Sequence, residues 1–161
     1  MAPPAKPRVY VETTVVSYLV ARPSKDLVVA AHQKLTCAWW AERREQFELF
    51  VSQSVVQECG SGDAHAAAAR LKEIAGLPRL PLNEDALELA RILLDRGALP
   101  PKSAEDALHI ALATVHGMDY LLTWNCRHIA NAESQQAISS ACLLCGYQAP
   151  VICTPEELMG C

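Results

Sequence analysis

The sequence predicts one α/β domain: a three-layer α/β/α arrangement with a mostly parallel sheet of four to five strands and helices on both faces. Three observations favour this fold. Short apolar runs alternate with longer segments of helical periodicity. No two of these runs are joined by the short turn of a β-hairpin. The 161 residues suit a single domain with its own core, and no linker or internal repeat divides them.

Five segments have the composition of strands. Residues 8–12 and 48–52 are rich in β-branched, aromatic and other apolar side chains. Residues 120–124 are almost entirely apolar, which is typical of a strand buried on both faces. Residues 77–82 contain two prolines and are therefore expected at an edge of the sheet. The last expected strand is 150–153.

The segments between these strands predict helices. Thr13 or Thr14 is expected to cap a short helix after the first strand, and Ser52 or Ser54 is expected to cap the helix that runs to Cys59. The other expected helices are residues 27–46, an Asp63-capped helix ending near Gly76, an Asn83-capped helix to about Arg96, 103–116, 134–145, and one that begins at Thr154.

The longest expected helix, residues 27–46, has apolar residues at spacings of three and four. This period predicts one buried face, formed by Val28, Ala31, Leu35, Ala38 and Trp39. Because Trp39 and Trp40 are adjacent, one is expected to face the core and the other a groove or a subunit contact.

The chain is 51% hydrophobic and has a formal net charge of −4. Binding of nucleic acid through a broad basic surface is therefore not expected, and any RNA contact must depend on local cations or a partner subunit. No apolar stretch approaches the roughly 20 residues of a membrane span. Residues 1–7 lack a signal-peptide core and are expected to form a disordered tail before a domain at 8–161. We expect a cytoplasmic protein without a membrane segment.

Seven cysteines, an odd number, predict free and reduced thiols in a chain without a secretion signal. Cys142 and Cys145 are the one close pair. On a helix they lie on one face and can pack in the core, or they can supply half of a zinc site. Core packing is favoured, because a structural zinc site needs four ligands and no second pair has a matching spacing.

Four polar side chains lie near the expected ends of strands and helices. Glu12 and Asn125 follow the strands at 8–12 and 120–124. Glu58 lies in the helix after the strand at 48–52, and Asp106 lies in the first turn of the helix at 103–116. Ligands of parallel sheets bind beyond the carboxyl ends of the strands. Clustered carboxylates repel and favour a bound cation, and oxygen ligands favour Mg²⁺ or Mn²⁺.

Each of these residues also has a structural interpretation. Glu12 can face solvent at the end of its strand, and Glu58 can be an exposed residue of an amphipathic helix. Asp106 fits the capping arrangement of a first helical turn. Asn125 can occupy a turn. His109 is expected to be a hydrogen-bonded, partly buried histidine rather than a ligand or base.

The motifs around the four residues resemble those of PIN-domain proteins, many of which are the VapC-like toxins of toxin–antitoxin pairs. The resemblance rests on residues 10–19, the stretch around Glu58, residues 106–111 and residues 120–125, and it extends from about residue 8 to residue 158. It implies a metal-dependent endoribonuclease in which acidic residues hold one or two Mg²⁺ or Mn²⁺ ions. It further implies an RNA substrate, a small antitoxin partner and a homodimer.

Residue by residue, the resemblance implies that Glu12 has the position of the first-strand aspartate and Glu58 that of the glutamate. Asp106 has the position of the central aspartate, and Asn125 one often held by a fourth acid. Thr123 matches a hydroxyl residue found just before that fourth position. The further candidates are Thr13 as a supporting residue and Arg127 and His128 as phosphate contacts, with exposed loop residues as the alternative for both. Arg22 and Lys25 are weaker candidates for the same phosphate contact.

Two residues depart from the family pattern. Glu12 is one methylene longer than aspartate, and Asn125 brings no charge. Three carboxylates are expected to hold a second metal less firmly than four, so the second ion would arrive with the scissile phosphate. The alternative is a catalytically weak or inactive PIN-like module that binds RNA or a protein. A phosphoacceptor receiver is disfavoured, because no strand end bears the paired acids that it requires.

Overall fold

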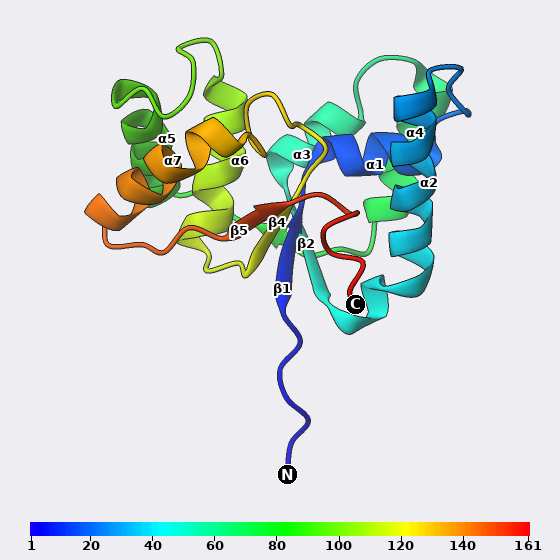
Figure 1. Ribbon diagram of the computed structural model, residues 1–161, viewed down its shortest axis with the longest axis horizontal. Helices are drawn as coiled ribbons and strands as arrows, with labels where there is room; N and C mark the ends of the chain where they lie inside the picture. The colour runs from blue at the N-terminus through cyan, green and yellow to red at the C-terminus, as the bar shows by residue number, and fades with distance from the viewer.

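A five-stranded sheet forms the centre of the structure, a computed structural model that describes residues 1–161 (Figure 1). Its strands are β1 (Arg8–Val11), β2 (Glu48–Ser52), β3 (Arg79–Leu80), β4 (Tyr120–Leu122) and β5 (Val151–Cys153). They lie in the order β3-β2-β1-β4-β5, and all four pairings are parallel. The predicted α/β fold is confirmed, and the proline-flanked β3 lies at an edge as predicted.

Seven α-helices and one short 3₁₀ helix, η1, join the strands. They are α1 (Thr13–Val20), α2 (Leu27–Glu42), η1 (Arg44–Gln46), α3 (Gln53–Cys59), α4 (Ala64–Ile74), α5 (Glu84–Asp95), α6 (Ala104–Val115) and α7 (Ala132–Leu144). Helices α5, α6 and α7 pack together on one side of the sheet, and α1, α2 and α4 on the other (Figure 1). The sheet is therefore the middle layer of three.

Strands β1 and β4 are the most deeply buried part of the sheet. Val9, Tyr10 and Val11 of β1 are completely buried, as are Leu121 and Leu122 of β4. A strand covered by helices on both faces has no solvent-facing positions, which explains why these segments are apolar without alternation. Residues 1–7 form no helix or strand and extend away from the sheet (Figure 1). None of the helices combines the length and apolar character that a bilayer crossing requires.

Three of the seven α-helices begin at the side-chain cap that the sequence predicts. Ser52, Asp63 and Asn83 each accept a hydrogen bond from a backbone N–H in the first turn of their helix. The prediction that Thr13 or Thr14 caps α1 is wrong. Glu12 is the cap residue, and its Oε2 accepts a 3.0 Å hydrogen bond from the Thr14 N–H.

Helix α2 presents a different face to the core from the one that the apolar spacing predicts. Val28 is 64% exposed, and the buried positions are Gln33, Thr36, Trp39 and Trp40. Both tryptophans are buried, so neither faces solvent. Indole hydrogen bonds set this rotation of the helix: Trp39 Nε1 donates to the carbonyl of Leu158 at 3.1 Å, and Thr36 Oγ1 accepts from the indole of Trp124 at 2.7 Å. These contacts outweigh the simple apolar period.

The helix predicted to begin at Thr154 is absent. The reciprocal capping bonds do form, since Glu157 N–H donates to Thr154 Oγ1 and Thr154 N–H donates to the Glu157 carboxylate. Only hydrogen-bonded turns follow. The carbonyl of Leu158 is taken by Trp39, and Gly160 has a φ of +89°, so the backbone leaves the helical region after one turn.

The seven cysteines are free thiols. Cys142 is completely buried and packs with its sulfur 3.8 Å from Thr114 Oγ1, and burial raises the pKa of its thiol. Cys145 is partly buried at the end of α7. The prediction that this pair packs against the core is confirmed for Cys142 and, in part, for Cys145.

Candidate functional site

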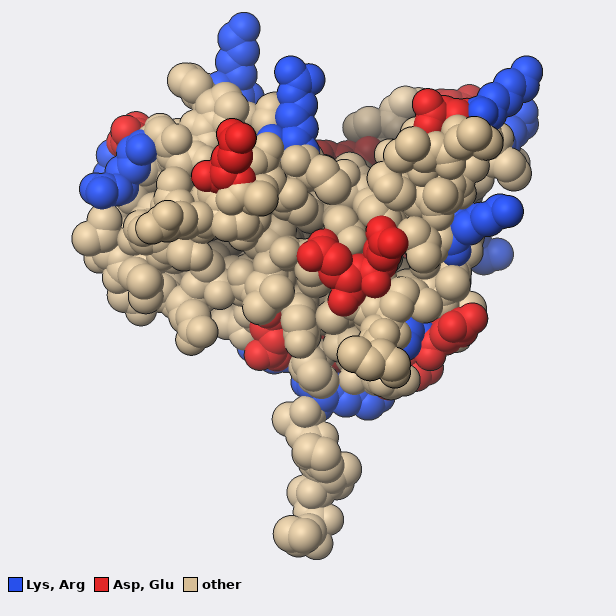
Figure 2. All heavy atoms as spheres, viewed as in Figure 1, with Lys and Arg blue, Asp and Glu red and all other residues tan.

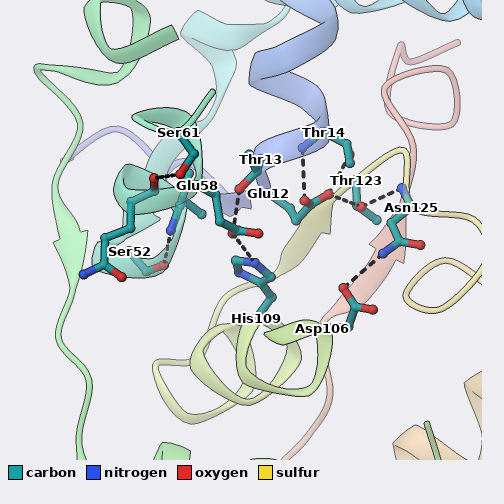
Figure 3. A network of polar contacts seen from close by, with 12 residues as sticks. Glu12, Thr13, Thr14, Ser52, Glu58, Ser61, Asp106, His109, Thr123 and Asn125 are labelled. Atoms are coloured by element: carbon teal, nitrogen blue, oxygen red, sulfur yellow. Dashed lines mark hydrogen bonds and ion pairs between the residues drawn. The ribbon is translucent and has the colours of Figure 1, made fainter. Parts of the chain in front are cut away.

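The candidate site lies at the C-terminal ends of β1 and β4. The order β3-β2-β1-β4-β5 means that the chain adds strands on one side of β1 and then crosses to its other side. Ligands of open α/β sheets commonly bind at such a switch point. Glu12 follows β1 directly, and Thr123 to Asn125 follow β4. Glu58 from α3 and Asp106 from α6 face the same region (Figure 3).

Glu12 is held firmly at this position. Its side chain is buried, and the residue is 4% exposed. Oε1 accepts hydrogen bonds of 2.6 Å from the hydroxyls of Thr14 and Thr123, and Oε2 accepts the capping bond from the Thr14 N–H. Thr123 belongs to the segment after β4, so the carboxylate links the ends of the two central strands.

Glu58 belongs to a chain of polar contacts that runs into the core. Its Oε1 accepts a 2.9 Å hydrogen bond from Thr13 and lies 2.7 Å from Nε2 of His109. The other ring nitrogen of His109 lies 2.7 Å from the Tyr10 hydroxyl, which is 2.7 Å from Ser52 Oγ. His109 and Tyr10 are buried, whereas the Glu58 side chain is 33% exposed. The candidate site is thus connected to the core by hydrogen bonds.

The Glu58–His109 contact shifts the pKa of both partners. Partial burial raises the pKa of the Glu58 carboxyl, but the hydrogen bond and charge of His109, with the bond from Thr13, lower it by more. Burial lowers the pKa of His109, whereas the bond to Glu58 and the nearby carboxylates raise it above its ordinary value. Burial also raises the pKa of Tyr10. Both pKa shifts favour the charged forms of this pair, the Glu58 carboxylate and the His109 imidazolium.

When His109 is protonated, the hydrogen bonds that join Glu58, His109, Tyr10 and Ser52 have a consistent set of donors and acceptors. Both ring N–H groups then donate, one to Glu58 and one to the Tyr10 oxygen. The Tyr10 hydroxyl donates onward to Ser52 Oγ, which also accepts from the backbone N–H of Val55. No member of the chain is left without a partner, which a buried charge requires.

Asp106 forms a second group with the loop after β4. Its Oδ1 accepts a 3.1 Å hydrogen bond from the Asn125 amide nitrogen, and its Oδ2 lies 3.0 Å from Nδ1 of His128. The Asn125 amide oxygen accepts from the His128 N–H at 3.1 Å. Ser103 makes no side-chain capping bond and instead approaches His128 at 3.3 Å. The capping interpretation of Asp106 is therefore not realised in this structure.

Trp124 anchors this loop to the helices on the other side of the sheet. Its N–H donates to Thr14 Oγ1 at 2.8 Å, and its indole donates to Thr36 on α2. The indole stacks on the imidazole of His32, with ring centroids 4.0 Å apart and an interplanar angle of 13°. Trp124, which lies between Thr123 and Asn125, is thus held in place by contacts with α1 and α2.

The structure brings most of the predicted residues together. Glu12, Thr13, Glu58, Asp106, Thr123 and Asn125 are all in the network of Figure 3. His128 joins it through Asp106, whereas Arg127 is exposed and contributes only its carbonyl, which accepts from Asn131. The exposed residues Arg22 and Lys25 lie in the loop between α1 and α2, beyond the far end of α1.

Sequence reasoning missed several members of the network. Thr14, Tyr10 and Ser52 were expected only as a cap or as strand residues, and no link from His109 to Glu58 was expected. A usable signal was present for His109, which lies three residues after Asp106 on the buried stripe of α6. An ionisable residue on such a stripe needs a buried polar partner. The sequence does not identify that partner.

The donor chemistry of the site fits a hard divalent cation. Both hydrogen bonds to the Glu58 carboxylate end on Oε1, so Oε2 is left to face the space next to Glu12 and Asp106 (Figure 3). Carboxylate oxygens are the ligands that Mg²⁺ and Mn²⁺ prefer. As they stand, no three His, Cys, Asp or Glu side chains are close enough to hold one ion. Ligation by more than two carboxylates would therefore need side-chain rotation.

Comparisons with protein-family models, with curated proteins and with solved structures found no match to this chain.

Proposed function

We propose that this protein is a metal-dependent endoribonuclease of the PIN-domain type that hydrolyses RNA phosphodiester bonds. Within that family, its motifs are most similar to those of VapC-like toxins of toxin–antitoxin pairs. On this proposal its partners are an RNA substrate, a small antitoxin protein and a second copy of the chain, and it acts in the cytoplasm.

One observation carries the proposal. Glu12, Glu58 and Asp106, three acids far apart in the sequence, lie with Asn125 around one region at the switch point of a parallel sheet. Each of the three is positioned by hydrogen bonds from the protein. Placing several carboxylates together is costly unless a cation offsets their repulsion, so this arrangement is expected where a function requires it.

In this mechanism Glu12, Glu58 and Asp106 would hold one or two Mg²⁺ or Mn²⁺ ions after side-chain rotation brings them closer together. When bound, such ions supply an activated water and stabilise the leaving oxygen of the phosphodiester. His109 keeps Glu58 ionised and fixes its Oε1, which leaves Oε2 for ligation. Asn125 donates to Asp106 and holds that carboxylate in place.

The loop after β4 is the best candidate for contact with the substrate. Arg127 is exposed next to the site, and its guanidinium can reach a phosphate oxygen. The Asp106 carboxylate already accepts from Nδ1 of His128 at 3.0 Å, so a phosphate contact by His128 would use the other ring nitrogen. Ligation by the Asn125 oxygen would require it to leave the His128 N–H.

One observation favours a second function: the carboxylates of Glu12 and Asp106 already have hydrogen-bond partners within the protein. Glu12 accepts three hydrogen bonds, and Asp106 is engaged through both oxygens. A site stabilised in this way without a metal suits a PIN-like module that binds RNA or a protein without cleaving it. Calorimetric titration with Mn²⁺ separates the two: the nuclease binds Mn²⁺ in the millimolar range or more tightly, whereas the non-catalytic module does not.

The proposed activity is tested by incubating the purified protein with single-stranded RNA and Mg²⁺ or Mn²⁺. We expect cleavage by the wild type and a loss of about a hundredfold or more in Asp106→Ala, because a metal ligand is removed. Glu105→Ala is the matched control, since Glu105 is the neighbouring, exposed acid in the same helical turn. Equal cleavage by wild type and Asp106→Ala would assign the activity to another site or to a contaminant.

A further inference from the structure

A polar groove lies between α1, α2 and α4, outside the acidic site. It is a cavity of about 660 Å³, and the lining residues used below are Ser17, Tyr18, Arg22, Gln33, Asp63 and Arg70. A second cavity of about 280 Å³ shares Tyr18, Ala21 and Gln33 with it and adds Lys34. We call the two together the α1–α4 groove.

The groove begins one helical turn from the acidic site. Thr13, which donates to Glu58, lies four residues before Ser17, so both side chains are on the same face of α1. One turn of helix corresponds to about 5.4 Å. Arg70 of α4 also connects the groove to the site, because its Nε donates to the carbonyl of Cys59, the residue after Glu58. Its Nη2 donates to the carbonyl of Ser61, so Nη1 is the guanidinium nitrogen without a bond to the protein. A polymeric ligand bound at the acidic site can therefore continue directly into the groove.

The charges that line the groove are mainly positive, although the protein is acidic. Arg22, Arg70 and Lys34 line the two cavities, and the one acid among the lining residues is Asp63. The Asp63 carboxylate caps α4 by accepting from the Ala66 N–H, which uses part of its capacity. In a chain of formal net charge −4, such a local excess of cations is the feature that an anionic ligand requires.

Figure 2 agrees with this distribution. Lys and Arg side chains project at the upper right, where Figure 1 places the loop between α1 and α2, with acidic side chains beside them. Other Lys and Arg side chains project at the upper left, and acidic side chains also lie on the front face. Arg22 is one of the exposed residues of that loop. One group of positive side chains therefore lies at the end of the molecule toward which α1 leads from the acidic site.

Tyr18 adds an aromatic face to the groove. Its ring lines both cavities and is only partly buried. It packs in a stacked arrangement near His32 and Trp124, with ring centroids 6.3 Å and 6.2 Å away and interplanar angles of 25° and 29°. These neighbours hold the ring in place, and a rigid, partly exposed ring can receive a nucleobase at little entropic cost.

We propose that the α1–α4 groove binds a nucleotide of single-stranded RNA next to the scissile bond, with its base on Tyr18 and its phosphate between Arg22 and Arg70. This inference rests on the proposed action on RNA and assigns the substrate class of the same site. The combination of a cationic rim and an aromatic surface matches a ribonucleotide, whereas a purely apolar groove would suit a protein helix.

The test measures the affinity for a fluorescein-labelled single-stranded RNA by fluorescence anisotropy in the non-cleaving Asp106→Ala background. Adding Arg22→Ala or Tyr18→Leu is expected to raise Kd about tenfold, since loss of one stacked base or one phosphate contact has an effect of this order. Arg22 is exposed, so its replacement leaves folding intact even where Tyr18→Leu disturbs the packing. Lys72→Ala, an exposed cation of α4 that lines neither cavity, is the matched control and should leave Kd unchanged.

Steady-state cleavage distinguishes this inference from the proposed activity. If the wild type cleaves RNA, Arg22→Ala should raise KM about tenfold and leave kcat within about twofold. Cleavage with unchanged Kd and KM in both groove variants would overturn the groove assignment alone, leaving the groove for a protein partner. RNA binding that depends on Arg22 in a protein that does not cleave RNA would support the groove assignment and overturn the nuclease proposal.

Discussion

The Nε2 atom of His109 lies 2.7 Å from Oε1 of Glu58, and the imidazole is buried while the carboxylate is one-third exposed. A buried imidazole whose pKa is raised by this contact is thereby placed behind one acid of the candidate site. The contact joins residues that are 51 positions apart in the sequence. It is a countercharge supplied by the fold itself, and it makes both the stability and the chemistry of the site depend on pH.

The Glu58–His109 pair predicts a pH window for stability. The lowered pKa of Glu58 means that its contribution is present above the ordinary carboxyl pKa and is lost as the pH falls through the folded value. The raised pKa of His109 means that its contribution is present below the ordinary imidazole pKa and is lost as the pH rises through the folded value. The pair should therefore stabilise the fold most between about pH 4.3 and pH 6.5.

Urea unfolding of wild type and Glu58→Gln at a series of pH values, with EDTA present, measures this contribution. The difference in the free energy of unfolding should reach about 1 kcal/mol inside the window, because Glu58 is partly exposed, and should fall on both sides of it. Glu133→Gln, an exposed acid in the first turn of α7, is the control and should show no such maximum. A difference that does not vary with pH would contradict an ionised pair.

Tyr10→Phe should destabilise the fold by about 1–3 kcal/mol. The hydroxyl lies between Ser52 and His109, and its removal leaves buried polar groups on both sides without a partner. Tyr147→Phe is the matched control, since Tyr147 is only partly buried and should cost less than about 0.5 kcal/mol. Chemical unfolding of the two variants gives both values. Similar losses would mean that the hydroxyl of Tyr10 has no special role in the core.

Thr123→Val tests the support of Glu12. Valine preserves the shape of threonine but removes the 2.6 Å hydrogen bond to the buried Glu12 carboxylate and the acceptor for the Asn125 N–H. We expect a loss of about 1–3 kcal/mol in the free energy of unfolding, because a buried charge loses a donor. Thr114→Val should cost less than about 1 kcal/mol, since that hydroxyl donates to the Ile110 carbonyl within its own helix. Equal losses would indicate that Glu12 does not depend on Thr123.

Mn²⁺ should raise the thermal stability of the wild type if the three acids hold the ion. At a free concentration one hundred times Kd, the expected stabilisation is about 2.7 kcal/mol, and removal of the ion with EDTA should reverse it. Asp106→Ala should lose most of this effect, whereas Glu105→Ala should keep it. Differential scanning fluorimetry with and without Mn²⁺ measures the shift. The same shift in Asp106→Ala would place the bound ion outside the proposed site.

The fold class and most elements were predictable because their signals are local. Helix caps such as Asp63 and Asn83 act within three residues, and the prolines around β3 mark an edge strand wherever the rest of the chain lies. The predictions that failed depended on distant contacts. The rotation of α2 is set by Trp39 bonding to Leu158, 119 positions away, and by Thr36 bonding to Trp124.

In the candidate site, too, some features follow from local sequence and others from distant contacts. The sequence by itself determined that Glu12 and Asn125 follow strands and that Glu58 and Asp106 lie in neighbouring helices, since parallel strands bring such positions to one edge. Only the tertiary structure decided which donors hold each acid. The bond from Thr123 to Glu12 spans 111 positions and the pair of His109 with Glu58 spans 51. Such partners depend on how whole layers pack, and no local pattern encodes that geometry.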